Sequence, residues 1–289
     1  MVKAAAVKKH IKINLDRLVE LDDERKALMQ TIEGKKAEQN RVSADIVAAN
    51  KDEVVKKQLI TEMQDLKAEI QKDEEKLKPV LEEWRQIMLQ VPNIPDMSVP
   101  DGESDEDNQE IKVWGEKTVF DFEPKSHTDL MVDLGMADFE RGAKVHGFRG
   151  YYLVGDGALL SWAIWNYAQD FFLKKGFTPI LPPTIVRKTN LYGTGHLPNE
   201  AEDVYHTQDE DYLIGTSEVS VMGYYSDEVL DKNIFPVKFL GFSPCYRREA
   251  GSHGKDVKGL IRVHEFYKLE QVVLCEASHE ESVKWHEEI

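Results

Sequence analysis

The chain has 289 residues, of which 41% are hydrophobic and 31% are charged, and its formal net charge is −16. This length suggests roughly two domains of the usual size, about 100–200 residues each. No stretch reaches the ~18 consecutive apolar residues that a membrane helix needs. The basic start also lacks the apolar core of a signal peptide, so we expect a cytoplasmic protein with no membrane association. The two cysteines, Cys245 and Cys275, have no zinc-ligand spacing, and we expect them to be buried small side chains.

The negative charge is unevenly distributed along the chain. Residues 1–90 contain 18 basic and 18 acidic residues, so the entire surplus of negative charge lies after residue 90. This balance permits contact between the first segment and an RNA backbone, but it also fits a solvated helix face.

Residues 1–90 are rich in Glu, Lys, Gln, Ala and Leu, which favour helix. The apolar residues of the second half fall on two heptad rails, as in a coiled-coil seam. The first rail is Leu59, Leu66, Val80 and Ile87, with Asp73 interrupting it, and the second is Met63, Ile70, Leu77, Trp84 and Val91. A polar turn near residues 49–52 then predicts an antiparallel helical hairpin with arms of ~50 Å. Pro79 should kink its second helix.

Residues 91–119 are expected to form a linker, since prolines end the helix and residues 100–110 are acidic and almost without apolar groups. From residue 120 to 289 the pattern is mixed. Residues 157–175 have helical spacing with Gly176 as a cap, and residues 204–215 resemble a hairpin. Residues 237–249 and 262–275 are predicted as two long strands joined by a glycine-rich loop. The predicted fold class is therefore α+β, with a helical hairpin followed by an antiparallel sheet core.

Charged and aromatic side chains gather on one face of these two strands. Because side chains alternate along a strand, Arg262, Phe266 and Glu270 should share a face of the second strand, and Arg247 and Glu249 a face of the first. Arginine pairs with phosphate and an aromatic ring can stack on a base, so this set suits a nucleotide triphosphate beside a small amino acid. An exposed face with ordinary ion pairs fits the alternation equally well, but the loop AGSHGKDVKG favours a phosphate site.

Three segments carry a family resemblance. The sequence CYRREAGSHGKDVKGLIRVHEFYKLE, residues 245–270, resembles motif 2 of class II aminoacyl-tRNA synthetases in the form found in seryl-tRNA synthetases. Residues 215–219, GTSEV, look like the serine-binding loop of that family. Residues 181–183 with 191–198 are similar to its motif 1 region and the segment after that motif. The resemblance covers nearly the whole chain and implies a serine-tRNA ligase that uses ATP and Mg²⁺.

The resemblance also implies roles for individual residues. It assigns Thr216, Ser217, Glu218 and Glu270 to L-serine, with Glu270 near the substrate hydroxyl. It assigns Arg247, Arg248, Glu249, Arg262, Val263 and Phe266 to ATP. Arg247 would bridge the serine carboxylate and the α-phosphate, Arg262 would hold the γ-phosphate, and Phe266 would stack on adenine. Arg247 and Arg262 are the implied catalytic residues, since the reaction needs charge neutralisation and positioning but no nucleophilic side chain.

The family further implies a homodimer built around motif 1 and an arm that binds tRNA-Ser and also tRNA-Sec. Basic residues near the hairpin turn are candidate phosphate contacts: Arg41, Lys51, Lys56 and Lys57. Motif 3 and the residues that help to hold Mg²⁺ would lie after Ile289, so no metal ligand is expected within the chain and we expect these 289 residues alone not to charge tRNA. The chain has Ser217, Ser220 and Arg248 where the family more often has Ala, Pro and Ser.

Two other functions remain open from the sequence. One is a related ligase that loads an amino acid onto a carrier protein, although the long arm argues against it. The other is an inactive coiled-coil interaction protein.

Overall fold

The structure, a computed structural model, describes residues 1–49, 52–250 and 259–289. Within these ranges the chain divides into two compact units, Met1–Lys117 and Thr118–Ile289. Each unit is described by itself.

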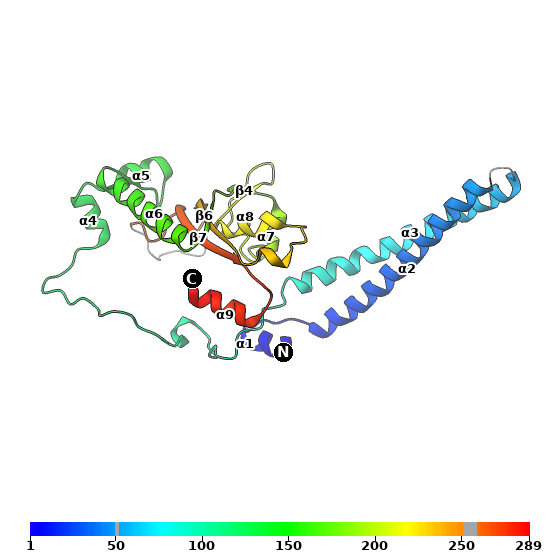
Figure 1. Ribbon diagram of the computed structural model, residues 1–289, viewed down its shortest axis with the longest axis horizontal. Helices are drawn as coiled ribbons and strands as arrows, with labels where there is room; N and C mark the ends of the chain where they lie inside the picture. The colour runs from blue at the N-terminus through cyan, green and yellow to red at the C-terminus, as the bar shows by residue number, and fades with distance from the viewer. Residues whose placement is uncertain (50–51, 251–258) are drawn as a thin grey trace. The chain divides into compact units, whose positions relative to one another are not determined.

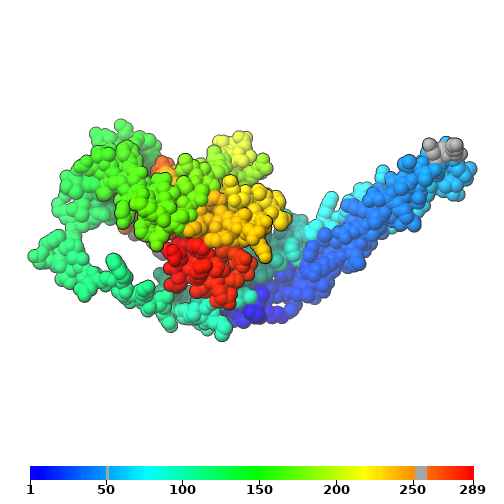
Figure 2. Space-filling model, viewed as in Figure 1, coloured from blue at the N-terminus to red at the C-terminus, as the bar shows by residue number. Residues whose placement is uncertain are grey.

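The first unit is dominated by two long helices, α2 (Leu15–Ala48) and α3 (Glu53–Met88), which pack side by side (Figures 1 and 2). Each helix begins with a side-chain cap that satisfies free backbone amides: Asn14 accepts from the amide of Arg17, and Asp52 accepts from those of Val54 and Val55. The helices end and begin on either side of the predicted turn, and the predicted helical hairpin is confirmed. Residues 50 and 51 of that turn lie outside the described residues.

The predicted heptad rails contain two of the buried apolar residues in the seam between the two helices, Ile70 and Val80. The facing helix α2 contributes four more, Leu18, Leu21, Ile32 and Val42. Asp73, which interrupts the rail, is also buried and accepts hydrogen bonds from Lys35 and Lys76, each at 2.8 Å. The long lysine stems bring ammonium groups to a carboxylate that the sequence pattern alone would leave without a partner. Helix α3 continues through Pro79 without interruption.

Shorter elements complete the first unit. Helix α1 (Val2–Lys8) precedes the arm, and the 3-10 turn η1 (Asp105–Asp107) follows it. Lys8 donates to the carbonyl of Val99, and His10 lies 3.2 Å from the carbonyl of Gly102. The segment after α3 therefore returns to the start of the chain.

The second unit combines short helices with three small sheets among the described residues. In chain order its elements are α4 (His127–Asp133), β1 (Ala137–Asp138), α5 (Phe139–His146), β2 (Tyr152–Leu153), α6 (Asp156–Lys174), β3 (Thr178–Ile180), β4 (Ile185–Val186), α7 (Lys188–Gly193), β5 (Tyr212–Leu213), α8 (Glu218–Met222), η2 (Gly223–Tyr225), η3 (Lys232–Ile234), β6 (Val237–Tyr246), β7 (Glu265–Leu274) and α9 (His279–Glu288).

The main sheet has the order β3-β6-β7. Strands β6 and β7 pair antiparallel over ten residues, with Gly241 opposite Glu270 and Cys245 opposite Phe266, which confirms the predicted pair of long strands. Strand β3 adds to β6 in parallel, so the sheet is mixed, because the chain between β3 and β6 crosses back to the same end of the sheet.

Helices lie against both faces of this sheet. Helix α6 covers one face, where Trp165 meets Phe242 edge-on with ring centroids 5.5 Å apart. Helix α8 and the loop before it cover the other face. Glycine at position 241 permits this approach, since a β-carbon there would lie 2.8 Å from the hydroxyl of Ser217.

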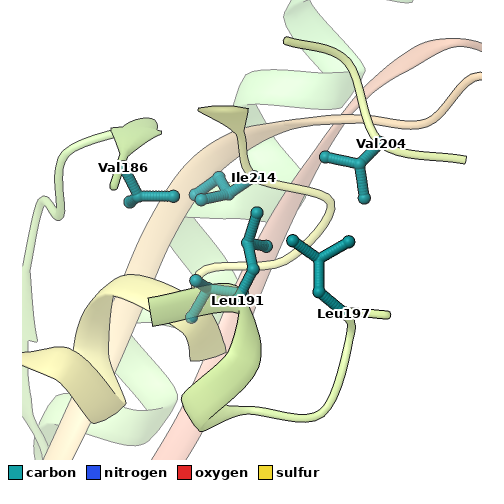
Figure 3. Packing of buried hydrophobic residues seen from close by; sticks show 6 residues of the cluster. Val186, Leu191, Leu197, Val204 and Ile214 are labelled. Atoms are coloured by element: carbon teal, nitrogen blue, oxygen red, sulfur yellow. The ribbon is translucent and has the colours of Figure 1, made fainter. Parts of the chain in front are cut away.

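A compact hydrophobic cluster supports the loop before α8 (Figure 3). Its members come from β4, α7, the segments before and after β5, and α8: Val186, Leu191, Leu197, Val204, Ile214 and Val219. Ile214 and Val219 flank residues 215–218 on each side, so burial of these two apolar side chains fixes both ends of that loop.

No helix among the described residues is long and apolar enough to cross a membrane. Both cysteines are free thiols, Cys245 fully buried and Cys275 partly buried.

Candidate functional site

The Glu270 carboxylate is the centre of a dense polar cluster. Its Oε1 accepts from the hydroxyl of Thr216 at 2.5 Å and from the ammonium of Lys268 at 2.7 Å. Its Oε2 accepts from both the amide and the hydroxyl of Ser217, each at 2.6 Å. Three of these four donors belong to the loop before α8, so strand β7 holds that loop through a single carboxylate.

These contacts keep Glu270 ionised. Burial raises the pKa of the Glu270 carboxyl, but hydrogen bonds from Lys268, Ser217 and Thr216 outweigh it, so the pKa lies below the ordinary 4.5. At neutral pH the site therefore contains a fixed, partly buried negative charge beside hydroxyl groups. Such a group can hold the ammonium or the hydroxyl of a small amino acid.

Arg247 lies one residue beyond β6 and covers the ring of Phe266, with 5.4 Å between its guanidinium carbon and the ring centroid. The Nε of Arg247 also donates to the carbonyl of Gly215 at 3.4 Å. Phe266 and Glu270 are four residues apart on β7 and therefore share a face. The guanidinium, the ring and the Glu270 cluster consequently lie on one side of the β6–β7 ribbon.

Arg262 and Glu249 are brought together, but not by strand alternation as the sequence predicts. Strand β7 begins at Glu265 and β6 ends at Tyr246, so neither residue is in a strand and the predicted extents 237–249 and 262–275 are too long. Glu249 has a φ of +54°, which breaks the alternation after Arg247. The two residues meet through an ion pair, in which Arg262 donates to Glu249 at 2.8 Å. Arg149 lies 4.0 Å from the same carboxylate.

The other predicted substrate residues lie around this turn and at the start of α8. Val263 is buried just before β7, and Arg248 is exposed in the turn after β6, with its amide bonded to the carbonyl of Asp203 at 2.9 Å. Glu218 is exposed as the first residue of α8, and no hydrogen bond joins it to the Glu270 cluster within the described residues.

A cavity of about 1140 Å³ lies on the opposite face of the sheet, between α6 and the side chains of Phe242, Tyr267 and Leu269. Of the residues predicted for substrate, only Phe266 lines it. The polar cluster, with its fixed charges, is therefore the better candidate for substrate chemistry than this mostly apolar space.

At the tip of the arm the predicted basic residues differ in their surroundings. Lys57 is exposed and Lys56 partly exposed in the first turns of α3, whereas Arg41 in α2 is paired with Glu38. Lys51 lies outside the described residues.

Three residues of the site, Arg149, Lys268 and Asp203, are not predicted by the sequence. Lys268 lies within the motif without an assigned role, although alternation places it between Phe266 and Glu270 and could have identified it. Asp203 lies 47 residues from its partner Ala250, and nothing in the local pattern points to it.

The antiparallel β6–β7 ribbon, with Arg247 over Phe266 and the partly buried Glu270 carboxylate on one face, is the arrangement expected of a class II aminoacyl-tRNA synthetase core. Residues 202–288 match the tRNA synthetase class II core domain of the G, H, P, S and T type, and residues 1–95 match the seryl-tRNA synthetase N-terminal domain. The chain belongs to the seryl-tRNA synthetase family.

Similarity to individual relatives extends over most of the chain. A serine–tRNA ligase of Clostridium tetani is 42% identical over 93% of this chain and 64% of its own length. One of Deinococcus radiodurans is 40% identical over 100% of this chain and 68% of its own length. The structure of seryl-tRNA synthetase from Pyrococcus horikoshii complexed with ATP matches 99% of this chain and 69% of its own, with a TM-score of 0.80 and 33% identity. The chain thus spans about two thirds of the length of these relatives.

Proposed function

We propose that this protein is a serine-tRNA ligase, which activates L-serine with ATP and transfers the seryl group to tRNA-Ser. The observation that carries the proposal is the Glu270 cluster with Thr216 and Ser217, which lies on the same face of the ribbon as Arg247 and Phe266. Residues 120–289 form the catalytic core, residues 91–119 a linker and residues 1–90 the tRNA-binding arm. The reaction takes place in the cytoplasm.

The chemistry requires two anions to approach each other. The serine carboxylate attacks the α-phosphorus of ATP, and pyrophosphate leaves to give seryl-adenylate. A hydroxyl of the 3′-terminal ribose of tRNA then attacks the seryl carbonyl carbon, which forms the ester and releases AMP. Arg247 lies between the serine loop and Phe266, so its guanidinium can neutralise both the carboxylate and the α-phosphate. Phe266 stacks on adenine. Arg262 holds the γ-phosphate, beside Arg248 and the backbone of Val263. Positioning and charge neutralisation together supply the rate enhancement, and no protein nucleophile is needed.

The charged cluster accounts for the choice of serine. Thr216, Ser217 and Glu270 receive the amino acid, and Glu218 at the start of α8 supplies a further carboxylate toward it. A pocket that bonds a hydroxyl strongly rejects an analogue that lacks it, because a buried polar group then loses a partner. Alanine is therefore excluded by its missing hydroxyl.

Mg²⁺ is proposed as the ion that accompanies ATP. Among the described residues no three His, Cys, Asp or Glu side chains form a group that could hold a metal. No step of the reaction is assigned to the ion.

Binding to the 289-residue chain tests the proposal. Calorimetry with a non-hydrolysable seryl-adenylate analogue and with the matching alanyl analogue measures the contribution of the hydroxyl directly. The expected preference for the seryl form is at least about a hundredfold, and Glu270→Ala should abolish most of it. Equal affinity for the two analogues would overturn the proposed amino-acid specificity.

The proposed tRNA contact is tested separately at the arm. Replacement of both Lys56 and Lys57 by Glu should weaken binding of tRNA-Ser. It should also make the slope of log affinity against log salt concentration shallower by about one for each phosphate contact that is lost. The matched control replaces Lys67 and Lys72, which are exposed further along α3, by Glu. Equal loss in both double variants would show that the tip has no special role.

A homodimer is proposed through α6. This helix has large exposed apolar side chains, among them Trp162 at 62% and Tyr167 at 76% exposure, and such a surface in a folded protein marks an interface. Sedimentation equilibrium should give a dimer for the parent chain and a monomer for the Trp162→Glu, Tyr167→Glu double variant. Asp170→Asn on the same helix should remain dimeric, and a monomeric parent at micromolar concentration would refute the proposal.

A further inference from the structure

The turn after β6 is held by a residue outside the motif. Asp203 accepts the amide of Ala250 on its carboxylate Oδ1 at 2.7 Å, and its backbone carbonyl accepts the amide of Arg248 at 2.9 Å. The two bonds lie on either side of Glu249. A single residue, distant in sequence, therefore braces both neighbours of Glu249.

Glu249 is the residue in this turn that needs bracing. Its φ of +54° lies in the left-handed region, which a residue with a β-carbon adopts at an energetic cost. Such a conformation persists where the surrounding structure over-determines it, and these positions cluster at functional sites. The two bonds from Asp203 supply that restraint.

The conformation of Glu249 decides where its carboxylate points. That carboxylate is 13% exposed and accepts from Arg262 at 2.8 Å. If the turn relaxed to an ordinary extended conformation, the Glu249 side chain would swing away and Arg262 would lose this contact. The orientation of Arg262 therefore depends on the backbone of the turn.

Asp203 itself is rigidly supported. Its neighbour Val204 is buried in the hydrophobic cluster of Figure 3 with Leu197, and its own amide donates to the carbonyl of Glu200 at 3.0 Å. The same cluster contains Ile214 and Val219, which flank the serine loop. One packed platform thus supports the amino-acid loop and, through Asp203, the turn that bears Arg248 and Glu249.

We propose that Asp203 is a positioning residue for the nucleotide: it fixes the left-handed turn at Glu249 and thereby aims Arg262 at the triphosphate. The inference rests on the proposed function in assigning ATP to Arg262. The hold of Asp203 on the turn does not depend on that assignment. Because the serine pocket has its own bonds to Glu270, the effect of Asp203 should fall on ATP and spare serine.

Three variants separate positioning from general stability. Asp203→Ala removes the carboxylate acceptor. Asp203→Asn removes the charge but keeps a carbonyl oxygen at the same place, so it should restore the bond to Ala250. Glu202→Ala is the matched control, because Glu202 is exposed and makes no hydrogen bond or ion pair with the described residues.

The readouts are the affinities for ATP and for L-serine, measured by calorimetry, with amide hydrogen exchange of residues 248–250. Asp203→Ala should weaken ATP binding about tenfold, as expected for one lost hydrogen bond. Its serine affinity should stay within about twofold of the parent. The amide of Ala250 should exchange faster in Asp203→Ala, and Asp203→Asn and Glu202→Ala should resemble the parent in every measurement.

Several results would overturn the inference. Parent-like ATP affinity in Asp203→Ala, or equal losses for ATP and serine, would exclude a positioning role. If Asp203→Asn bound ATP as weakly as Asp203→Ala, the negative charge of Asp203 would matter and its hydrogen bond to the amide of Ala250 would not. If the parent chain bound no ATP, the proposed function would be refuted. Hydrogen exchange alone would then decide whether Asp203 holds the turn, and unchanged exchange of residues 248–250 in Asp203→Ala would refute that role.

Discussion

The Glu270→Gln substitution is the most direct test of how the Glu270 cluster is built. The carboxylate accepts four hydrogen bonds, two on each oxygen, and its side chain is only 16% exposed. Glutamine keeps the volume but replaces one acceptor oxygen by an NH₂ donor. Whichever way the amide turns, its NH₂ faces either the ammonium of Lys268 or the backbone amide of Ser217.

The cost follows from the bonds that must be lost. A hydrogen bond to a charged group contributes about 1.5–3 kcal/mol, and a buried donor left without a partner adds its desolvation penalty. The hydroxyls of Thr216 and Ser217 can rotate to accept from the new amide, which offsets part of the loss. We therefore expect the free energy of unfolding to fall by about 3 kcal/mol.

Two further substitutions calibrate this value. Ser217→Ala removes one hydroxyl donor while its amide keeps the bond to the same oxygen, so the loss should be smaller, about 1 kcal/mol. Glu265→Gln makes the same chemical change on an exposed position of the opposite face of β7 and should alter stability by less than about 0.5 kcal/mol.

Urea unfolding followed by circular dichroism measures all three variants. The pKa of Glu270 is depressed in the folded state, so its contribution is complete above the unfolded value of about 4.3 and is lost as the pH falls through the folded value. The difference between parent and Glu270→Gln should therefore be constant from pH 6 to 8, roughly, and should shrink below about pH 4. A Glu270→Gln chain as stable as Glu265→Gln at neutral pH would refute the reasoning.

Three more predictions address other parts of the structure. The pKa of Asp73 is lowered to about 2, chiefly by a hydrogen bond from Lys35 and next by one from Lys76. The stability difference between the parent and Asp73→Asn, measured by circular dichroism of the helices, should therefore persist above about pH 4 and vanish as the pH falls from about 4 to about 2. A difference independent of pH would contradict this. Gly241→Ala should destabilise the chain by about 1–3 kcal/mol in urea unfolding, because its β-carbon would lie 2.8 Å from the Ser217 hydroxyl. Burial raises the pKa of the Cys245 thiol, so iodoacetamide should modify Cys275 first, as mass spectrometry of timed samples would show, and equal rates would be inconsistent with the packing.

Local patterns predicted those parts of the fold in which local periodicity and tertiary packing agree. The heptad rails identified the seam of the arm, including Ile70 and Val80, because a coiled-coil seam repeats along the chain. The alternation of side chains likewise placed Phe266 and Glu270 on one face of β7, because this period of two also repeats along the strand. The parallel pairing of β3 with β6 could not be predicted in this way, since it joins segments about 60 residues apart through contacts with no local signature.

Within the site, the alternation of side chains predicted positions only for residues that lie in a strand, and β6 ends at Tyr246 while β7 begins at Glu265. Arg262 and Glu249 were expected on strand faces, and their meeting depends instead on a left-handed residue that no periodicity indicates. Lys268 differs, because its position between Phe266 and Glu270 follows from the strand. Its partner Thr216, 52 residues away, does not.

The polar network also explains why the predicted residues converge despite these differences in local structure. Glu270 on β7 takes donors from a loop whose ends are fixed by Ile214 and Val219, and the turn after β6 is bonded to Asp203, beside Val204 of the same cluster. A displacement of this cluster would therefore move the serine loop and the nucleotide turn together. Substitutions that enlarge or empty the cluster should consequently affect both affinities, whereas changes at Asp203 or Glu270 should affect one each. If substitutions in the hydrophobic cluster lower the affinity for both ATP and serine, the cluster is a shared support of the two binding regions. If they lower only one affinity, the two regions are held independently.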